Sequence, residues 1–391
     1  MDHLTNPYAP GAGRMPAALV GRDEQRVAWS NGMDRVMAGR DDRSLVLYGL
    51  RGVGKTVLLS DLMRSAEGKG WITGFAEAGT GKSLRELLSE ALQLPLADLA
   101  RPDASERVRS ALKTFTSFQA SVTPEGTWTF GLDLDATHGS HADSGSLDLD
   151  LSQIVREVSA AAGENGRGLA LLIDEAQDLT PDELTAICSV MHMATQRRWP
   201  VLIALAGLPS LPVKLGEAKS YAERLFSYHQ VRELSGHHAR AAIVDPAADQ
   251  DVTWDEDALH TVIDATSGYP YFLQEYGQAA WKAADTASEH ITYADARVAH
   301  EAALRTLDSG FFRVRWERAT PTERDYLKAM AVDGDEGSSS GEVASRLGKK
   351  ITALGPIRAN LIAKGLVYAP EHGQIAFTVP RMADFITRQL D

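Results

Sequence analysis

Residues 49–56 combine glycine, lysine and threonine in a spacing that is typical of a phosphate-binding turn. The segment GLRGVGKT has a glycine, four residues and then Gly-Lys-Thr. Glycines allow the backbone to curl so that successive N–H groups point at phosphate oxygens. The lysine can reach the terminal phosphates, and the threonine hydroxyl can bind Mg²⁺. The residues predicted to hold a nucleotide triphosphate here are Gly49, Arg51, Gly52, Val53, Gly54, Lys55, Thr56 and Val57.

A pair of carboxylates follows a second apolar run, in the segment LALLIDEAQDL at residues 169–179. Asp174 ends the run and is placed to hold Mg²⁺ together with Thr56, directly or through water. Glu175, the next residue, can polarise an attacking water as a general base. The simpler alternative is a helix N-terminus that favours acidic residues. The pair favours ATP hydrolysis, at a slow rate if the protein is a switch.

Strand-like and helix-like stretches alternate through residues 41–235. This order indicates which strands and helices position the phosphate-binding turn and the acidic pair. Short apolar runs predict strands at 44–50, 71–78, 169–173, 201–207 and 227–234. Helical spacing follows at 55–66, at 83–93, from Pro181 and through LGEAKSYAERLF. Near-continuous apolar strands between helices predict an α/β fold, a parallel sheet covered on both faces.

Residues 112–150 interrupt this alternation and predict an insertion. TWTFGLDLD at 127–135 alternates polar and apolar residues, which is typical of a half-exposed strand. We expect it to form a hairpin with 114–123 across the turn PEG, followed by a polar loop at 136–146. His138 and His141 lie in that loop, where two histidines are more often solvated than metal-bound.

The remaining segments divide into an N-terminal lead-in and two C-terminal domains. We expect residues 1–40 to supply a flexible lead-in. Helical patterns without strands at 236–305 predict a helical cluster. Two capping boxes, beginning at Thr320 and Ser339, a third helix and a hairpin around PEHG follow in 306–391. Three helices and a hairpin in this order predict a winged helix.

Composition narrows the possible partners. The net charge is −13, and residues 306–391 carry 12 basic against 11 acidic residues, so the preceding 305 residues hold the remaining −14. Any nucleic-acid contact is therefore expected at the C-terminal end. The single cysteine, Cys188, is expected to be a buried helix residue and fits a reducing cytoplasm. No apolar run approaches a membrane span, so we expect a cytoplasmic protein.

Four further segments support a family resemblance. They are LVGRDE at 19–24, DEAQD at 174–178, AGLP at 206–209 and SGYP at 267–270. With the phosphate loop, this set resembles the AAA+ ATPases of the origin-recognition/Cdc6-like group and the related STAND signalling ATPases. It is most similar to bacterial AAA ATPases with a C-terminal winged helix. The resemblance covers nearly the whole chain except 112–150.

The resemblance implies roles for residues outside the phosphate loop. Val20, Gly21 and Arg22 would line the adenine pocket, and Pro270 would belong to a lid motif that touches the nucleotide. Arg224 would be an arginine finger acting on a neighbouring subunit, which implies self-association; the alternative is a solvated helix arginine. The origin-type pattern places an arginine near Tyr271, and this chain lacks it. The strand at 201–207 ends in Ala-Gly instead of a polar sensor, with Ser210 as a stand-in.

Two functions remain open from the sequence. The first is an ATP-binding switch, with Mg²⁺, whose winged helix binds double-stranded DNA through Lys349, Lys350, Arg358 and Lys364. The second is a STAND-type ATPase that oligomerises on ATP and recruits a protein partner without binding DNA. Both bind ATP and ADP. A metabolic kinase is disfavoured because no small-substrate domain is evident.

Overall fold

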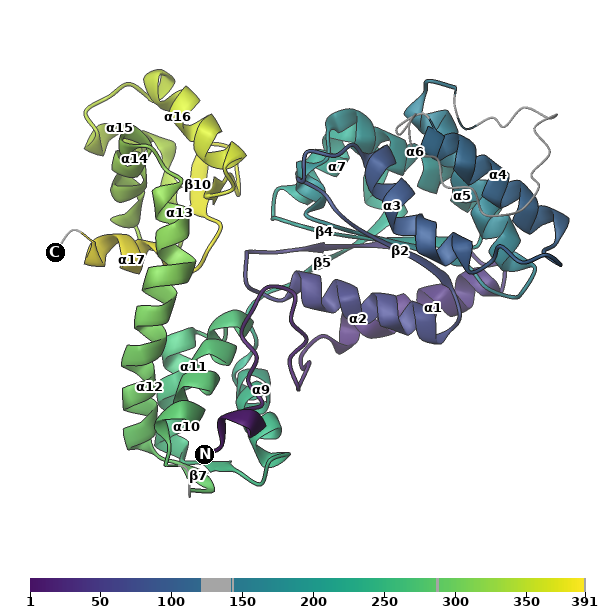
Figure 1. The fold of residues 1–391 in the computed structure, drawn as a ribbon. Coiled ribbons are helices and arrows are strands. Elements are labelled where there is room, and N and C mark those ends of the chain that lie inside the picture. Colours follow the sequence, from purple (N-terminus) through teal and green to yellow (C-terminus); the bar gives the residue numbers. More distant parts are fainter. Residues whose placement is uncertain (121–141, 143, 286–287, 390–391) are drawn as a thin grey trace. The chain divides into compact units, whose positions relative to one another are not determined.

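The structure, a computed structural model, describes residues 1–120, 142, 144–285 and 288–389 (Figure 1). The chain forms two compact units. The sheet unit contains Arg22–Tyr48 and Lys55–Gln230. The lid unit contains Met1–Gly21, Gly49–Gly54 and Val231–Asp391.

The sheet unit is built on a five-stranded parallel sheet in the order β2-β3-β4-β1-β5. Its strands are β1 (Ser44–Tyr48), β2 (Ile72–Glu77), β3 (Leu169–Asp174), β4 (Val201–Gly207) and β5 (Phe226–Gln230). Its helices are α1 (Asp23–Met37), α2 (Lys55–Gly68), α3 (Leu84–Ala97), α4 (Glu106–Ala120), α5 (Leu147–Gly163), η2 (Ala176–Asp178), α6 (Pro181–Arg197), α7 (Leu211–Ala218) and α8 (Ala222–Leu225). The predicted α/β fold is confirmed.

Helices cover both faces of this sheet, which explains the apolar strands. Figure 1 shows α1 and α2 on one face and α3 and α6 on the other. Every residue of β3 and β4 is buried, as expected for strands at the middle of a covered parallel sheet. Cys188 is also fully buried on α6, and this burial raises the pKa of its thiol to about 11. The prediction of a buried cysteine on a helix is confirmed.

The prediction of a hairpin within 112–150 is wrong for its first strand. Residues 114–120 belong to α4 instead of a strand. Val108, Leu112, Phe115 and Phe118 recur at helical spacing and are buried in the core of the unit, and this periodicity outweighs the local alternation. The expected second strand at 127–135, with His138 and His141, lies outside the described residues.

A buried ion pair links two helices that flank this insertion. The Arg85 guanidinium on α3 contacts the carboxylate of Asp150 on α5, and Asp150 is fully buried. Asp150 also accepts a bond from the Ser144 N–H at 2.9 Å. Because removing one partner leaves an uncompensated buried charge, this pair holds α3 and α5 in one arrangement.

The lid unit begins with helices where the sequence predicted them. Its elements are η1 (His3–Thr5), α9 (Gly236–Ala248), β6 (Thr253–Trp254), α10 (Glu256–Thr266), α11 (Pro270–Ala283), β7 (His290–Ile291), α12 (Tyr293–Thr306), the π-helical η3 (Leu307–Phe312) and α13 (Arg313–Glu317). Helices α12 and α13 run on through η3 as one column in Figure 1. The expected absence of strands is wrong in one detail, since β6 and β7 pair in parallel.

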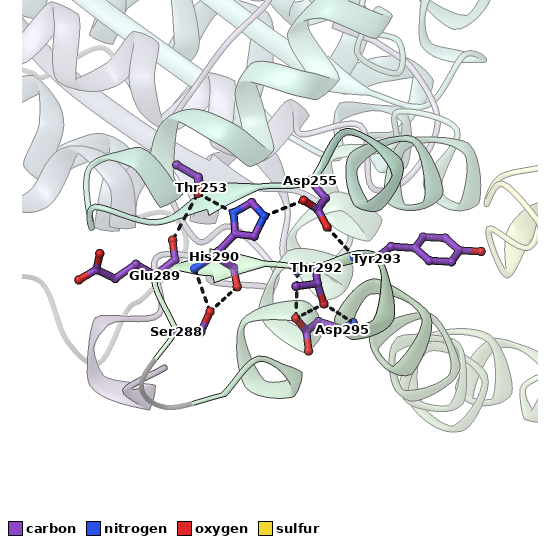
Figure 2. Close-up of polar contacts among 8 residues, drawn as sticks. All are labelled: Thr253, Asp255, Ser288, Glu289, His290, Thr292, Tyr293 and Asp295. Carbon is purple, nitrogen blue, oxygen red and sulfur yellow. Dashed lines mark hydrogen bonds and ion pairs between the residues drawn. The ribbon is translucent and has the colours of Figure 1, made fainter.

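A polar cluster around His290 holds β6 and β7 together (Figure 2). Its imidazole contacts Asp255 at 2.6 Å through Nε2 and Thr253 at 2.7 Å through Nδ1. Asp255 also accepts from the Tyr293 N–H at 3.2 Å, and the bond with His290 lowers the pKa of Asp255. The cluster therefore ties the start of α12 to the start of α10.

The first residues of the chain are part of the lid unit, so the expected flexible lead-in is wrong. Tyr8 is buried and donates its hydroxyl to the Ile243 carbonyl at 2.5 Å. It accepts from the Trp254 indole N–H at 3.2 Å, and the Trp281 ring packs edge-on against it. Such a tyrosine stabilises the fold because its ring buries apolar area and its buried hydroxyl has hydrogen-bond partners.

The C-terminal part of the lid unit contains four helices and a small antiparallel sheet among the described residues. Its elements are α14 (Pro321–Ala331), β8 (Ser338–Ser339), α15 (Ser340–Arg346), α16 (Ile351–Ala363), β9 (Val367–Tyr368), β10 (Gln374–Phe377) and α17 (Met382–Arg388). The strands pair in the order β8-β10-β9. The predicted capping box at Thr320 and Glu323 is present. Among the described residues, no helix is long and apolar enough to cross a bilayer.

Candidate functional site

Thr56 of the phosphate motif bonds the first acidic residue inside the sheet unit. Thr56, in the first turn of α2, donates its hydroxyl to Asp174 at the end of β3, with an O–O distance of 2.5 Å. Asp174 is 3% exposed and also accepts from the Glu175 N–H at 2.9 Å. Burial raises the pKa of Asp174, while the Thr56 bond and the Lys55 charge oppose that shift. A cation bound beside Asp174 would favour the ionised carboxylate.

Lys55 and the Thr56–Asp174 pair have the composition of a nucleotide-linked Mg²⁺ site. Lys55 begins α2 and is 7% exposed. The described residues contain no group of three or more His, Cys, Asp or Glu able to hold a metal. Mg²⁺ usually takes one or two protein oxygens and completes its shell with phosphates and water. The residues present fit such an ion.

Glu175 has a strained backbone. Its φ of 48° lies in the left-handed region, which side chains larger than glycine rarely adopt. Such a conformation generally costs about 1–3 kcal/mol and persists only where the surroundings enforce it. The strain turns the chain directly after β3, where the sequence placed the general base.

Gln177 positions Glu175 and is a residue to which sequence analysis assigned no role. It is 3% exposed, and its side-chain amide donates to the Glu175 carboxylate at 2.6 Å. Its amide oxygen accepts from the Leu208 N–H at 2.8 Å, directly after β4. Its carbonyl accepts from Lys214 at 2.6 Å. The only sequence signal was its place in the DEAQD segment.

Gly207 is required where β4 meets Gln177. A Cβ at Gly207 would lie 2.6 Å from the Gln177 amide oxygen and 2.9 Å from Leu211. This explains why the strand ends in Ala-Gly, since Gln177 fills the space that a larger side chain would take. Ser210, the expected stand-in sensor, precedes α7 and makes no capping bond there with its side chain.

Replacing Gln177 with alanine should slow ATP hydrolysis about 10- to 100-fold, because a misplaced catalytic group costs that much. The affinity for ATP should stay within about twofold, since Gln177 contacts Glu175 and the end of β4. Steady-state turnover and equilibrium binding measure the two effects. Gln196→Ala, on exposed α6 surface, is the control. Equal losses in affinity and turnover would contradict the positioning role.

The glycine loop, residues 49–54, contacts the lid and the C-terminal elements within the lid unit. The Arg51 N–H donates to the Thr378 carbonyl at 2.9 Å, directly after β10. The Tyr271 N–H, on α11, donates to the Gly52 carbonyl at 3.3 Å. Gly52 and Gly54 have φ values of +87° and +91°, which only glycine adopts readily.

The other residues expected to bind the nucleotide lie on several elements. Gly21 has a φ of +68°, and a Cβ there would lie 2.9 Å from the His238 ring on α9. Val20 packs on the apolar core of the lid unit, and Arg22 is buried just before α1. Pro270 is the first residue of α11. Their roles in nucleotide binding stay predictions.

The arginines and lysines expected to contact partners differ in solvent exposure and in whether they already bond other residues of the chain. Arg224 on α8 and Lys349 and Lys350 before α16 are exposed. Lys364 instead donates to Glu323 at 2.6 Å and to the Arg318 carbonyl at 3.0 Å. Arg358 is half-buried and donates to the Gln374 carbonyl at 3.1 Å. The last two side chains serve the internal structure of the domain.

Comparisons with known proteins agree with this geometry. Residues 18–204 match the AAA ATPase domain family, and residues 309–386 match a domain of unknown function, DUF8462. The chain is similar to the Walker-type ATPase PABY2304 of Pyrococcus abyssi, with a TM-score of 0.59, 16% identity and coverage of 94% of this chain and 96% of that chain. No curated protein matches the sequence.

Two weaker likenesses are found among solved structures. Cdc6p from Pyrobaculum aerophilum has a TM-score of 0.47 and 14% identity, with 100% of this chain and 99% of that chain covered. The RuvB Holliday junction branch migration motor of Thermotoga maritima has a TM-score of 0.45 and 13% identity, with 91% and 92% covered. Of the three structures named here, the Pyrococcus ATPase has the TM-score that shows a shared fold.

The parallel sheet, the glycine loop and the acidic pair after β3 define a P-loop ATPase. Residues 18–204 match the AAA ATPase domain family, so this part of the chain is an AAA ATPase domain, as the sequence predicted.

Proposed function

We propose that this ATPase is a nucleotide-gated switch whose output is the C-terminal domain, residues 306–391. The observation that carries the proposal is the bond between the Arg51 N–H of the glycine loop and the Thr378 carbonyl. Thr378 is buried and bonds the Gly365 carbonyl through its hydroxyl at 2.7 Å. A rearrangement of the loop on nucleotide binding therefore acts directly on the segment that joins β9, β10 and α17.

We assign the following roles at the nucleotide. The glycine loop and Lys55 bind the phosphates, with Val20, Gly21, Arg22 and Pro270 contacting the rest of the nucleotide. Thr56 and Asp174 hold Mg²⁺, which, when bound, screens the charge of the phosphates. Glu175 takes the proton of the attacking water, and Gln177 orients its carboxylate. Arg224 is exposed on α8 and can reach a second copy, so we include self-association in the proposal.

The experiment that tests the switch is hydrogen exchange of residues 365–378 with ATP, with ADP and without nucleotide. We expect exchange in this segment to differ between the ATP and ADP states, because local opening reports the strength of such contacts. Identical exchange in all three states, with saturation of the site verified by calorimetry, would reject the proposed coupling.

We further propose that the C-terminal domain is a winged helix, with the order α14, α15, α16 and the β9–β10 hairpin as support. Lys349 and Lys350 are the exposed basic residues at the start of α16, where a winged helix can approach DNA. The alternative is a protein partner, as in STAND-type ATPases. This alternative is supported by Arg358 and Lys364, because both side chains bond other residues inside the domain.

A salt-dependent DNA titration separates these two outputs. If DNA binds, Lys349→Ala with Lys350→Ala should weaken affinity for duplexes of any sequence. It should also reduce the slope of log affinity against log salt by about 2, one for each lost phosphate contact. Fluorescence anisotropy across a salt series measures both effects. The control is Arg297→Ala with Arg305→Ala, two exposed arginines on α12. Absence of DNA binding by the wild type favours the protein partner.

A further inference from the structure

Lys214 on α7 is an exposed lysine whose ammonium group bonds the main chain just after the acidic pair. Its Nζ donates to the Gln177 carbonyl at 2.6 Å. Leu211 and Leu215, on either side of it in the sequence, are both fully buried, so α7 is held firmly in the sheet unit. Side chains of a helix lean toward its N-terminus, and α7 begins shortly after β4. Lys214 therefore reaches back to the end of β4, where Gln177 lies.

The first turn of a helix is an unfavourable place for a cation. The positive end of the helix dipole lies there, and α7 has no acidic residue in its first turn to balance Lys214. The bond to the Gln177 carbonyl offsets this repulsion, because a hydrogen bond from an ionised donor is stronger than a neutral one. The position of Lys214 is therefore explained by the carbonyl that it bonds and is disfavoured by its own helix.

Gln177 is held at three points by different parts of the sheet unit. Its amide oxygen accepts from the Leu208 N–H at 2.8 Å, and its amide nitrogen donates to the Glu175 carboxylate at 2.6 Å. Its carbonyl accepts from Lys214. The element that carries it, η2, is a single 3₁₀ turn of three residues. So short a turn has few bonds of its own, and the main-chain position of Gln177 therefore depends on the Lys214 contact.

We propose that Lys214 is a positioning residue for ATP hydrolysis, because it fixes the main chain of Gln177, whose amide orients the Glu175 carboxylate. The inference deepens the proposed function and rests on it. Without this bond the Gln177 amide shifts, and Glu175 no longer faces the attacking water in a constant orientation. A displacement of about 1 Å at a reacting group can cost about 100-fold in rate. Lys214 is the exposed end of a chain of bonds that reaches the general base.

The test compares ATP turnover and ATP affinity in Lys214→Met, which keeps an unbranched side chain and removes the charge. We expect turnover to fall about 2- to 30-fold, the effect of a residue that acts through a bonded network. ATP affinity should stay within about twofold, which also verifies the fold. Lys214→Arg should recover most of the rate, since a guanidinium can donate to the same carbonyl. Lys219→Met is the matched control, because Lys219 ends the same helix, where its charge acts on the Cys188 thiol.

A double mutant shows whether Lys214 acts through Gln177. If it does, Lys214→Met combined with Gln177→Ala should turn over within about twofold of Gln177→Ala alone, because both changes remove the same interaction. Losses that multiply in the double mutant would overturn the positioning role. Unchanged turnover in Lys214→Met, or an equal loss of affinity and turnover, would overturn it as well and leave the ATPase site intact. Failure of the wild type to bind or hydrolyse ATP would instead reject the proposed function itself.

Discussion

Replacing Lys55 with alanine should abolish the binding of both ATP and ADP, with losses of affinity of about 100-fold or more. Lys55 is 7% exposed at the first position of α2, and the proposed function assigns its ammonium group to the phosphates of a bound nucleotide. A charge-assisted contact in such a desolvated place generally contributes about 1.5–3 kcal/mol, and the lysine makes more than one.

The fold should survive this substitution. Lys55 is a buried cation before nucleotide arrives, and alanine is the residue best suited to a helix. Lys55 also opposes the rise in the pKa of Asp174, so its loss should favour protonation of that carboxylate and weaken Mg²⁺ binding as well. The lost phosphate contact and the weaker Mg²⁺ binding both lower the affinity for nucleotide.

Isothermal titration calorimetry with each nucleotide provides the measurement, and circular dichroism verifies the fold. Lys69→Ala is the control, because Lys69 lies at the opposite end of the same helix and pairs with Asp34 at 2.5 Å. Affinity within twofold of the wild type in Lys55→Ala would place the phosphates somewhere other than this motif.

The elements that carry the chemistry were predictable because their signals are local. Strands β1 and β3 are buried on both faces, so the chain shows them as uninterrupted apolar runs. The glycine loop and the acidic pair follow these runs directly. Their placement needs only the rule that parallel strands end at one edge of the sheet.

The segments whose structure was predicted wrongly depend on partners that are distant in the sequence. Phe115 and Phe118 are three residues apart on α4, and both are fully buried, but residues 114–123 were expected to be a strand as the hairpin partner of the alternating segment 127–135. Tyr8 lies in a polar, proline-containing segment without periodicity. Its burial depends on Ile243 and Trp254, more than 230 residues later.

The same reasoning explains which site residues could not be predicted. Gln177 acts because η2 brings its amide between Glu175 and the residue after β4, and neither contact has a local sequence signal. Lys364 and Arg358 have the charge of DNA-binding residues, but Glu323 and the Gln374 carbonyl already bind them. The sequence shows that these side chains are charged, but only the fold shows that partners within the chain already bind them.

Replacing Glu175 with glutamine should leave ATP bound and nearly stop its hydrolysis. General-base catalysis contributes about 10²–10⁴ to a rate, so turnover should fall by at least 100-fold. Glutamine has the same shape, and its carbonyl oxygen can still accept the bond from the Gln177 amide. The strained backbone at φ 48° is unchanged, so the variant removes only the proton acceptor.

Single-turnover hydrolysis and ATP affinity, measured on the same preparation, test this assignment. Affinity should remain within about threefold of the wild type, because in the proposed mechanism Glu175 accepts a proton from water, whereas Lys55 and the glycine loop bind the phosphates. Asp182→Asn is the control, since Asp182 is an exposed acid in the first turn of α6. Rapid turnover by Glu175→Gln would refute Glu175 as the base and leave Asp174 as the acidic residue nearest to Thr56. A joint loss of affinity and rate would instead show that glutamine disturbs the turn after β3.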